Sequence, residues 1–305
     1  MRHGGERRFR ISEDGRYLRW HASFRKKSSA NSGKEVQSVA KKEKRLKDIL
    51  ASMRSVLVAY SGGADSTLLL KAAKDMLGKN VLAVTADSAT LPSRELKDAR
   101  AIAKKLGVKH ILVRTRELSN SKFFNNDAAR CYWCKKELYS KLRDVARQHN
   151  ISHIVDGSNA EDKSDYRPGA RAVRECGVRK PLEEAGLFKE EIRKLSKKLR
   201  LPSWNKPSSA CLASRVPYGV KIKGNTLARI EKAENVLKDL GFAGARVRHH
   251  GDIARIEVGK KQIPKLFKGK AKNKIIGSLK KLGYSYITID LEGYTRGSLN
   301  KLLRK

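Results

Sequence analysis

The chain has 305 residues and a formal net charge of +38, from 69 lysines and arginines against 31 aspartates and glutamates. This length predicts a large domain with a smaller one, or two domains. No apolar run approaches the roughly 18 residues of a membrane span, and the N-terminus lacks the apolar stretch of a secretory signal. We therefore expect a cytoplasmic protein. Its charge favours nucleotides, phosphates or RNA as partners, unless it only reflects a lysine-rich solvated surface.

The first part of the chain changes in composition before the first predicted strand. Residues 1–38 are basic and rich in Ser, Gly and Asn, which predicts a disordered extension. Apolar residues from Val39 to Met53 then recur at helical spacing. The apolar run 56–60 predicts a buried strand, and residues 67–77 predict a helix.

Strands and helices continue to alternate along the next stretch. Strands are predicted at 81–85, 110–113 and 151–155, with helices near 93–106 and 135–149. This alternation predicts an α/β fold with a doubly wound parallel sheet.

The pattern changes again after about residue 220. A helix is predicted at 225–240, followed by two short strands at 245–249 and 253–258. A helix at 272–282 and a strand at 284–291 complete the chain. We expect a small C-terminal α+β domain with a mainly antiparallel sheet.

A turn rich in serine and glycine joins the first predicted strand to its helix. It contains Ser61, Gly62, Gly63, Asp65 and Ser66. Its glycines allow positive φ and a close approach of the backbone, and free N–H groups at the start of a helix bind phosphate. The lysine of a Walker A loop is absent. The sequence therefore predicts a phosphate cradle distinct from Walker A, unless the turn holds no ligand.

The same turn resembles the phosphate loop of PP-loop ATP pyrophosphatases, which cleave ATP between its α and β phosphates. That resemblance implies ATP as a cofactor and an adenylated substrate. Asp65 is expected to help place Mg²⁺. Asp87 follows the second predicted strand, where the adenine or ribose would lie beyond the carboxyl ends of the strands.

Four cysteines occur, at positions 131, 134, 176 and 211. A reducing compartment favours metal ligands or nucleophiles over disulfides. Cys131 and Cys134 form a C-x-x-C, and with Cys211 they suit a [4Fe–4S] cluster with one open iron. A zinc site would need a fourth ligand from Cys176 or a histidine. The spacing leaves the cluster, zinc, a redox dithiol and buried apolar cysteines all open.

Cys211 is also a candidate nucleophile. Lys206 and Arg215 flank it in sequence, and nearby cations lower the pKa of a thiol. A thiolate is the natural nucleophile toward an acyl-adenylate.

Seven segments together resemble the LarE family, the ATP-dependent sulfur transferases of the nickel-pincer nucleotide pathway. The segments are 61–66, 156–159, 165–169, 177–182, 206–219, 246–250 and 290–294. The similarity covers about residues 40–300, and Ala-Cys-Leu-Ala-Ser-Arg at 210–215 is much more specific than the phosphate loop, which many families share.

The resemblance implies adenylation of a carboxylate of pyridinium-3,5-biscarboxylic acid mononucleotide, followed by displacement of AMP by Cys211. One-cysteine members of the family give up the sulfur of that cysteine. Members with an added C-x-x-C are associated with a [4Fe–4S] cluster that presents an extra sulfide. The pattern here therefore implies a cluster on Cys131, Cys134 and Cys211, with Cys176 structural.

Three arginines are candidates for binding the phosphate of a mononucleotide. Arg246 and Arg248 lie on one face of a predicted strand, and Arg215 is the third. Arginine suits bidentate phosphate contacts, although surface arginines are common in a basic chain. We expect Arg215, together with Asp65 and Cys211, to serve catalysis.

Other functions compete with this one. A PP-loop tRNA thiolase also adenylates its substrate, and the charge favours RNA. A non-catalytic nucleic-acid-binding protein would leave the phosphate loop and the cysteines unused, and an amide-forming synthetase needs no C-x-x-C. We expect a homo-oligomer that acts on a small-molecule nucleotide. Its predicted parts are the extension 1–38, a PP-loop domain over 39–220 and a substrate or oligomerisation domain over 221–305.

Overall fold

The computed structural model describes residues 24–163, 168–207 and 210–295. The chain divides into two compact units, Met1–Lys41 and Lys42–Lys305. Helix α1 (Phe24–Ala51) crosses that boundary, so its backbone includes part of the predicted extension. Residues 1–23, and parts of two segments that carry the family resemblance, lie outside the described residues.

Four parallel strands form the larger sheet in the order β3–β2–β1–β4. They are β1 (Val56–Ala59), β2 (Val81–Asp87), β3 (Lys109–Arg114) and β4 (His153–Asp156). The chain moves outward from β1 to β3 and then returns to the other side of β1 as β4. Ligands bind at such a switch point, beyond the carboxyl ends of the strands. The prediction of a doubly wound parallel sheet is confirmed.

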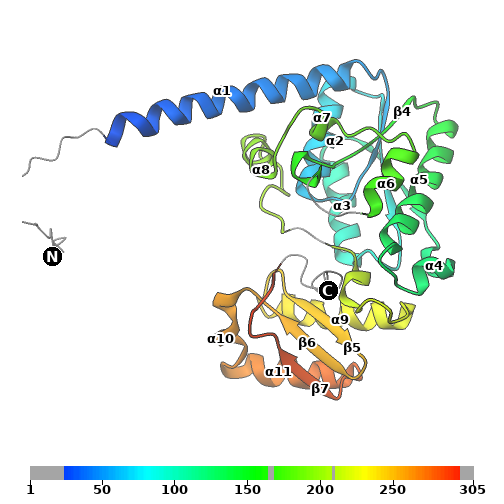
Figure 1. Cartoon of the computed structure of the whole chain (residues 1–305), viewed down its shortest axis with the longest axis vertical. Helices are drawn as coiled ribbons and strands as arrows, with labels where there is room; N and C mark the ends of the chain where they lie inside the picture. Colours follow the sequence, from blue (N-terminus) through cyan, green and yellow to red (C-terminus); the bar gives the residue numbers. More distant parts are fainter. Residues whose placement is uncertain (1–23, 164–167, 208–209, 296–305) are drawn as a thin grey trace, which may run out of the picture. The chain divides into compact units, whose positions relative to one another are not determined.

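Helices cover both faces of this sheet (Figure 1). On one face, Leu57 and Val84 of the sheet pack with Tyr139 and Leu142 of α5 (Arg130–Gln148). On the other face lie α2 (Ala64–Leu77) and α3 (Ser93–Lys105), which connect consecutive strands. The remaining helices of this part are α4 (Ser121–Phe124), α6 (Pro168–Glu175), α7 (Pro181–Glu184) and α8 (Lys189–Lys198).

The C-terminal part contains a three-stranded sheet in the order β5–β6–β7. Its elements are α9 (Gly224–Asp239), β5 (Arg246–His250), β6 (Ile253–Glu257), α10 (Ile263–Leu266), α11 (Gly269–Lys281) and β7 (Tyr286–Ile289). β5 and β6 pair antiparallel, whereas β6 and β7 pair parallel. The prediction of a mainly antiparallel sheet is therefore wrong. Helices α10 and α11 carry the chain back across the sheet before β7 begins, which makes the last pair parallel.

Polar contacts join α9 to α3. The backbone N–H and the hydroxyl of Ser93 both donate to Glu231 at 2.6 Å, and Arg94 forms an ion pair with Asp239 at 2.7 Å. The domain boundary expected near residue 220 stays a prediction. No helix in the described ranges is both long and apolar enough to cross a membrane.

Candidate active site

The phosphate loop lies between β1 and α2, at the switch point of the sheet. Gly62 has a φ of 71°, and a Cβ there would lie 2.8 Å from the Cβ of Ala99. The hydroxyls of Ser61 and Ser66 are 3.0 Å apart. The loop therefore needs glycine at position 62, and it leads into the N-terminal, electropositive end of a 14-residue helix.

The loop after β4 packs directly against the start of α2. A Cβ at Gly157 would lie 2.9 Å from the backbone nitrogen of Ser66. The N–H of Ser158 donates to Asp156 at 3.0 Å, which fixes the turn. The absence of a side chain at Gly157 thus lets two loops from neighbouring strands form one wall.

A cleft of about 500 Å³ opens at this edge of the sheet. Among the predicted site residues, its lining includes Ser61, Gly63, Asp65, Ser66, Cys134 and Cys211. The fold therefore brings the phosphate loop, one cysteine of the C-x-x-C and the downstream Cys211 to a single cavity.

Asp65 lies in the wall of this cleft with one carboxylate oxygen unused. The side-chain amide of Asn159 donates to its Oδ2 at 3.1 Å. Its Oδ1 is buried and has no hydrogen-bond partner among the described residues. Burial raises the pKa of Asp65, although Lys189 and Asn159 oppose that rise. A buried carboxylate oxygen without a partner fits Mg²⁺, which takes oxygen ligands.

Cations from α8 line the cleft near the phosphate loop. Lys189 and Arg193 are four residues apart, so they share one face of the helix. Arg193 donates to the carbonyl oxygen of Lys206 at 3.3 Å. The sequence analysis missed Lys189 and Arg193, because a basic pair on an amphipathic helix looks like a solvated face until the fold places it.

Lys206 also lines the cleft, but two carboxylates of α3 neutralise its charge. Its Nζ lies 2.7 Å from Glu95 and 3.0 Å from Asp98. Proximity to Cys211 in sequence therefore does not leave this lysine as an unpaired cation beside the thiol.

A third lysine in the cleft, Lys135, belongs to a chain of polar groups. Its Nζ donates to the hydroxyl of Tyr139 at 3.0 Å and lies 3.6 Å from Asp156. The Tyr139 hydroxyl in turn donates to Asp156 at 2.7 Å. Although burial opposes the charge, Tyr139 and Asp156 hold the pKa of Lys135 above its usual range. Lys135 follows Cys134 directly, so a fixed cation lies beside the C-x-x-C.

Asp156 carries the matching negative charge. Burial works against its carboxylate, but Lys135, the Tyr139 hydroxyl and Ser158 outweigh burial and hold the pKa of Asp156 below its usual range. An ionised Asp156 at the end of β4 therefore anchors Lys135 next to the phosphate loop.

The cysteines of the C-x-x-C lie at the start of α5, near Cys211. Burial raises the pKa of both Cys131 and Cys134, and the neighbouring Cys211 adds to the rise in each. All four cysteines are free thiols. Within the described ranges, no group of three or more His, Cys, Asp or Glu side chains is arranged to hold a metal ion. Cys176 does not line the cleft and packs beside the α5 core instead.

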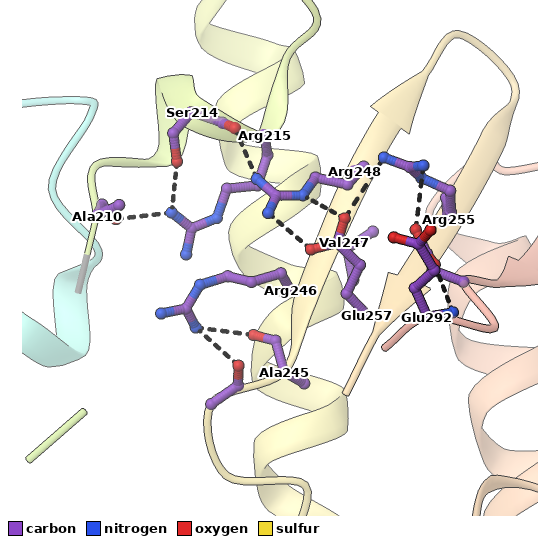
Figure 2. Close-up of polar contacts among 12 residues, drawn as sticks. Ala210, Ser214, Arg215, Ala245, Arg246, Val247, Arg248, Arg255, Glu257 and Glu292 are labelled. Atoms are coloured by element: carbon purple, nitrogen blue, oxygen red, sulfur yellow. Dashed lines mark hydrogen bonds and ion pairs between the residues drawn. The ribbon is translucent and has the colours of Figure 1, made fainter. Parts of the chain in front are cut away.

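The turn that carries Cys211 is held from two sides. The N–H of Leu212 donates to the carbonyl oxygen of Thr90 at 2.8 Å. Arg215 donates to the carbonyl oxygen of Ala210 at 2.7 Å (Figure 2) and to that of Cys211 at 3.0 Å. These contacts fix the backbone on either side of the Cys211 thiol.

Arg215 is only 1% exposed and is paired with Glu234 of α9. Its Nε and Nη2 donate to the two carboxylate oxygens at 2.8 and 2.9 Å. Although burial opposes the charge, Glu234 holds the pKa of Arg215 above its usual range. This geometry supports a role for Arg215 in positioning Cys211.

Glu117 is a buried carboxylate in the cleft that the sequence analysis missed. Its Oε1 accepts hydrogen bonds from Ser88 and, at 3.1 Å, from Thr90. Its Oε2 is buried without a hydrogen-bond partner in the described part of the chain. Ala86 and Ser88 line the cleft, whereas Asp87 is exposed and outside the lining, because successive side chains at the end of β2 point to opposite sides.

Arg248 lies outside the cleft lining, in the C-terminal sheet. It donates to both oxygens of Glu257 at 2.9 and 2.6 Å, and to the carbonyl oxygen of Ser214 at 2.8 Å (Figure 2). Cross-strand pairing of β5 with β6 brings this buried pair together. The contact with Ser214 connects the sheet to the turn of Cys211.

Arg246 also lies outside the cleft lining, with its guanidinium near that of Arg215 (Figure 2). It donates to the carbonyl oxygens of Gly244 and Ala245 at 3.2 and 2.9 Å. Burial and the neighbouring charge of Arg215 lower the pKa of Arg246. Phosphate binding by Arg215, Arg246 and Arg248 stays a prediction.

Sequence comparisons relate this site to known proteins. Residues 55–129, which include the phosphate loop, match the family of the queuosine biosynthesis protein QueC. An uncharacterised protein of Synechocystis is 42% identical over 260 residues, covering 85% of this chain and 97% of its own length. Pyridinium-3,5-bisthiocarboxylic acid mononucleotide synthase of Lactiplantibacillus plantarum is 38% identical over 271 residues, covering 88% and 98%. This chain belongs to the LarE family.

Membership of the LarE family makes the protein an ATP-dependent, sulfur-transferring enzyme of the PP-loop class. A more distant likeness, to the ammonia-dependent NAD⁺ synthetase of Staphylothermus marinus, is 29% over 178 residues. It covers 53% of this chain and 61% of that synthetase. The LarE likeness covers nearly the whole chain, including Cys211, which the shorter QueC match does not reach.

Proposed function

We propose that the protein adenylates a carboxylate of pyridinium-3,5-biscarboxylic acid mononucleotide and converts it to a thiocarboxylate through Cys211. The observation that carries this proposal is that one cleft is lined by both the phosphate loop and Cys211. An acyl-adenylate formed at the loop therefore lies in the same cavity as its sulfur nucleophile. The name of the Lactiplantibacillus relative supports the choice of substrate.

In the first half-reaction, a carboxylate oxygen of the substrate attacks the α-phosphorus of ATP. The bond from that phosphorus to the bridging oxygen breaks, and pyrophosphate leaves. Asp65 is the candidate Mg²⁺ ligand, because it lines the cleft and its buried Oδ1 lacks a hydrogen-bond partner among the described residues. Lys189 and Arg193 can offset the charge that develops on the leaving pyrophosphate.

In the second half-reaction without a cluster, the thiolate of Cys211 attacks the acyl carbon and AMP leaves, which gives a thioester. Loss of the Cα proton of Cys211 and cleavage of its Cβ–Sγ bond then release the thiocarboxylate and leave dehydroalanine. Arg215 and Thr90 hold the backbone of the Cys211 turn. Lys135 lines the same cleft, where it can stabilise the negative charge of the adenylate. These residues hold the Cys211 thiolate and the acyl-adenylate close together, which lowers the entropic part of the activation free energy.

We further propose that Cys131, Cys134 and Cys211 hold a [4Fe–4S] cluster. Cys211 raises the pKa of both Cys131 and Cys134, so the three free thiols lie near one another and offer three sulfur donors. When bound, such a cluster would supply labile sulfide as the transferred sulfur. Without it, Cys211 itself would be the sulfur source, as in the second half-reaction above.

Arg246 and Arg248 remain our candidates for binding the 5′-phosphate of the substrate. Arg215 is the third candidate. Support comes from the convergence of three guanidinium groups next to the Cys211 turn. A homo-oligomer is also part of this proposal. Ile253 and Tyr286 are paired neighbours on β6 and β7 and are 38% and 66% exposed, which gives the small sheet an apolar spot for a second copy.

The test is a product analysis with purified protein, ATP, Mg²⁺ and the dicarboxylate mononucleotide. We expect AMP, pyrophosphate and a thiocarboxylate product, with Cys211→Ala retaining AMP formation and losing the sulfur product. Formation of ADP and orthophosphate would contradict the PP-loop chemistry. If tRNA rather than the mononucleotide stimulated AMP formation, the thiolase alternative would replace our proposal.

A further inference from the structure

The lysines between Val258 and Ile289 form an unusual stretch of this chain. Nine lysines and no aspartate or glutamate occur between these residues. They are Lys260, Lys261, Lys265, Lys268, Lys270, Lys272, Lys274, Lys280 and Lys281. All nine are exposed, and none has an ion-pair partner among the residues that the structure describes. By contrast, Lys42 and Lys206 pair with carboxylates. This surface therefore keeps its positive charge uncompensated.

One face of α11 concentrates this charge. Lys270, Lys274 and Lys281 recur at spacings of four and seven, so they lie on the same face of the helix. That face is turned away from the buried Ile275 and Leu279. We call these three residues the lysine stripe.

Gly277 lies on the same face of α11 as the lysine stripe, between Lys274 and Lys281. A glycine inside a helix is destabilising relative to alanine, and a Cβ at this position would meet nothing within 4 Å. Packing among the described residues therefore gives no reason for a glycine here. Its effect is to let a partner approach the helix backbone closely at the centre of the stripe.

We propose that the lysine stripe and Phe267 bind single-stranded RNA at a site separate from the ATP cleft. Phe267 precedes the lysine at position 268 and is 59% exposed. An exposed aromatic ring beside lysines can stack on an unpaired base while the lysines contact the phosphates. Among the described residues, none from the C-terminal sheet domain lines the ATP cleft, so RNA and ATP can bind together.

An anionic membrane is the main competing partner for such a surface, and the structure disfavours it. Interfacial helices insert an apolar face into the lipid. The apolar face of α11 instead packs into the core of its own domain, where Ile275 and Leu279 are 4% and 0% exposed. Charge remains on the free face, which suits a phosphate backbone.

The experiment measures binding of a fluorescent single-stranded RNA across a series of salt concentrations. The test variant is Lys270→Gln/Lys274→Gln/Lys281→Gln. The control variant, Lys79→Gln/Lys104→Gln/Lys141→Gln, removes the same charge from exposed lysines elsewhere. Since each phosphate contact on a single strand contributes roughly 0.7 to the salt slope, we expect the stripe variant to lose about 2 units of slope. The control should keep the slope of the unmodified protein.

Phe267→Ala should weaken RNA binding several-fold and leave the salt slope unchanged, because stacking releases no counterions. All variants should keep the AMP-forming activity of the unmodified protein, which shows that they fold. Equal losses in the stripe and control variants would overturn the proposal, as would tighter binding to single-stranded DNA or to phosphatidylserine vesicles than to RNA.

Discussion

The side-chain amide of Asn159 donates a hydrogen bond to Asp65 Oδ2 at 3.1 Å, so the loop after β4 holds the carboxylate of the phosphate loop. The other oxygen of Asp65 is buried and has no hydrogen-bond partner within the described ranges. One oxygen is thus fixed by the protein, while the other is left for a ligand.

Replacing Asp65 with Asn should abolish AMP formation and stabilise the fold. The amide can still accept from Asn159, while the cost of a buried, unpaired carboxylate disappears. We expect the free energy of unfolding at neutral pH to rise by about 1 kcal/mol. Asp75→Asn on the outer part of α2 is the matched control and should leave activity intact. Retention of magnesium-dependent activity by Asp65→Asn would remove Asp65 from the metal site.

The same variant makes a pH prediction. Because burial raises the pKa of Asp65 in the folded state, the folded protein binds more protons than the unfolded chain between the ordinary pKa and the raised one. Stability therefore falls as pH rises through that window. The melting-temperature advantage of Asp65→Asn should be largest at neutral pH and should shrink below the ordinary pKa. An advantage that is constant with pH would show that the Asp65 carboxylate is not the cause.

Gly157→Ala should impair the ATP half-reaction more than it impairs folding. The added methyl group would lie 2.9 Å from the nitrogen of Ser66 and push the phosphate loop out of place. We expect at least a tenfold loss in AMP formation, equivalent to about 1.4 kcal/mol. Gly277→Ala is the control, since its methyl group meets nothing within 4 Å and should add up to about 1 kcal/mol of stability.

Arg248→Ala should destabilise the protein, because it removes the closer of the two arginines that pair with the buried Glu257, at 2.6 Å, and keeps only the Arg255 contact at 3.4 Å of those two. Breaking a buried ion pair from one side costs roughly 3–5 kcal/mol. Arg248→Met combined with Glu257→Gln should recover much of that loss while still lacking the arginine. If Arg248 binds the substrate phosphate, the double variant should fold but show a raised KM for the mononucleotide. An unchanged KM would move the phosphate site elsewhere.

The sulfur source can be decided by mass spectrometry after turnover. If a cluster supplies sulfide, anaerobically purified protein should contain about four irons per chain at full occupancy, and its polypeptide mass should not change after several turnovers. The brown colour of the cluster should disappear in each of Cys131→Ser, Cys134→Ser and Cys211→Ser. The control variant Cys176→Ser should keep it. Dehydroalanine at position 211 after a single turnover would instead identify Cys211 as the sulfur donor.

The sequence predicted the larger sheet well because its strands are continuous apolar runs between recognisable turns. Val56–Ala59 and Val81–Asp87 are both strands close to the predicted bounds. The small sheet was harder, since the direction of β7 depends on how α10 and α11 cross the sheet. No local pattern encodes that crossing.

The site was predictable where chemistry is local, as in the phosphate loop from Ser61 to Ser66. It was not predictable where a residue distant in sequence neutralises the charge of a side chain. Arg248 looks like a free phosphate ligand until strand pairing brings Glu257 against it. Glu117 and Lys189 gave no signal at all, because only the assembled fold places them in the cleft.

Glu234 belongs to α9, beyond the boundary suggested by the change in sequence pattern, yet it neutralises Arg215 in the turn of Cys211. It also accepts the N–H of Val247 at the start of the small sheet, at 3.0 Å. A fragment that ends near residue 220 would lose the counter-ion of Arg215 and also Leu227 and Ile230, which pack in the same core cluster as the turn of Cys211. Residues up to about 220 therefore do not form a separable module: a gene fusion that transferred them alone would carry a defect beside Cys211.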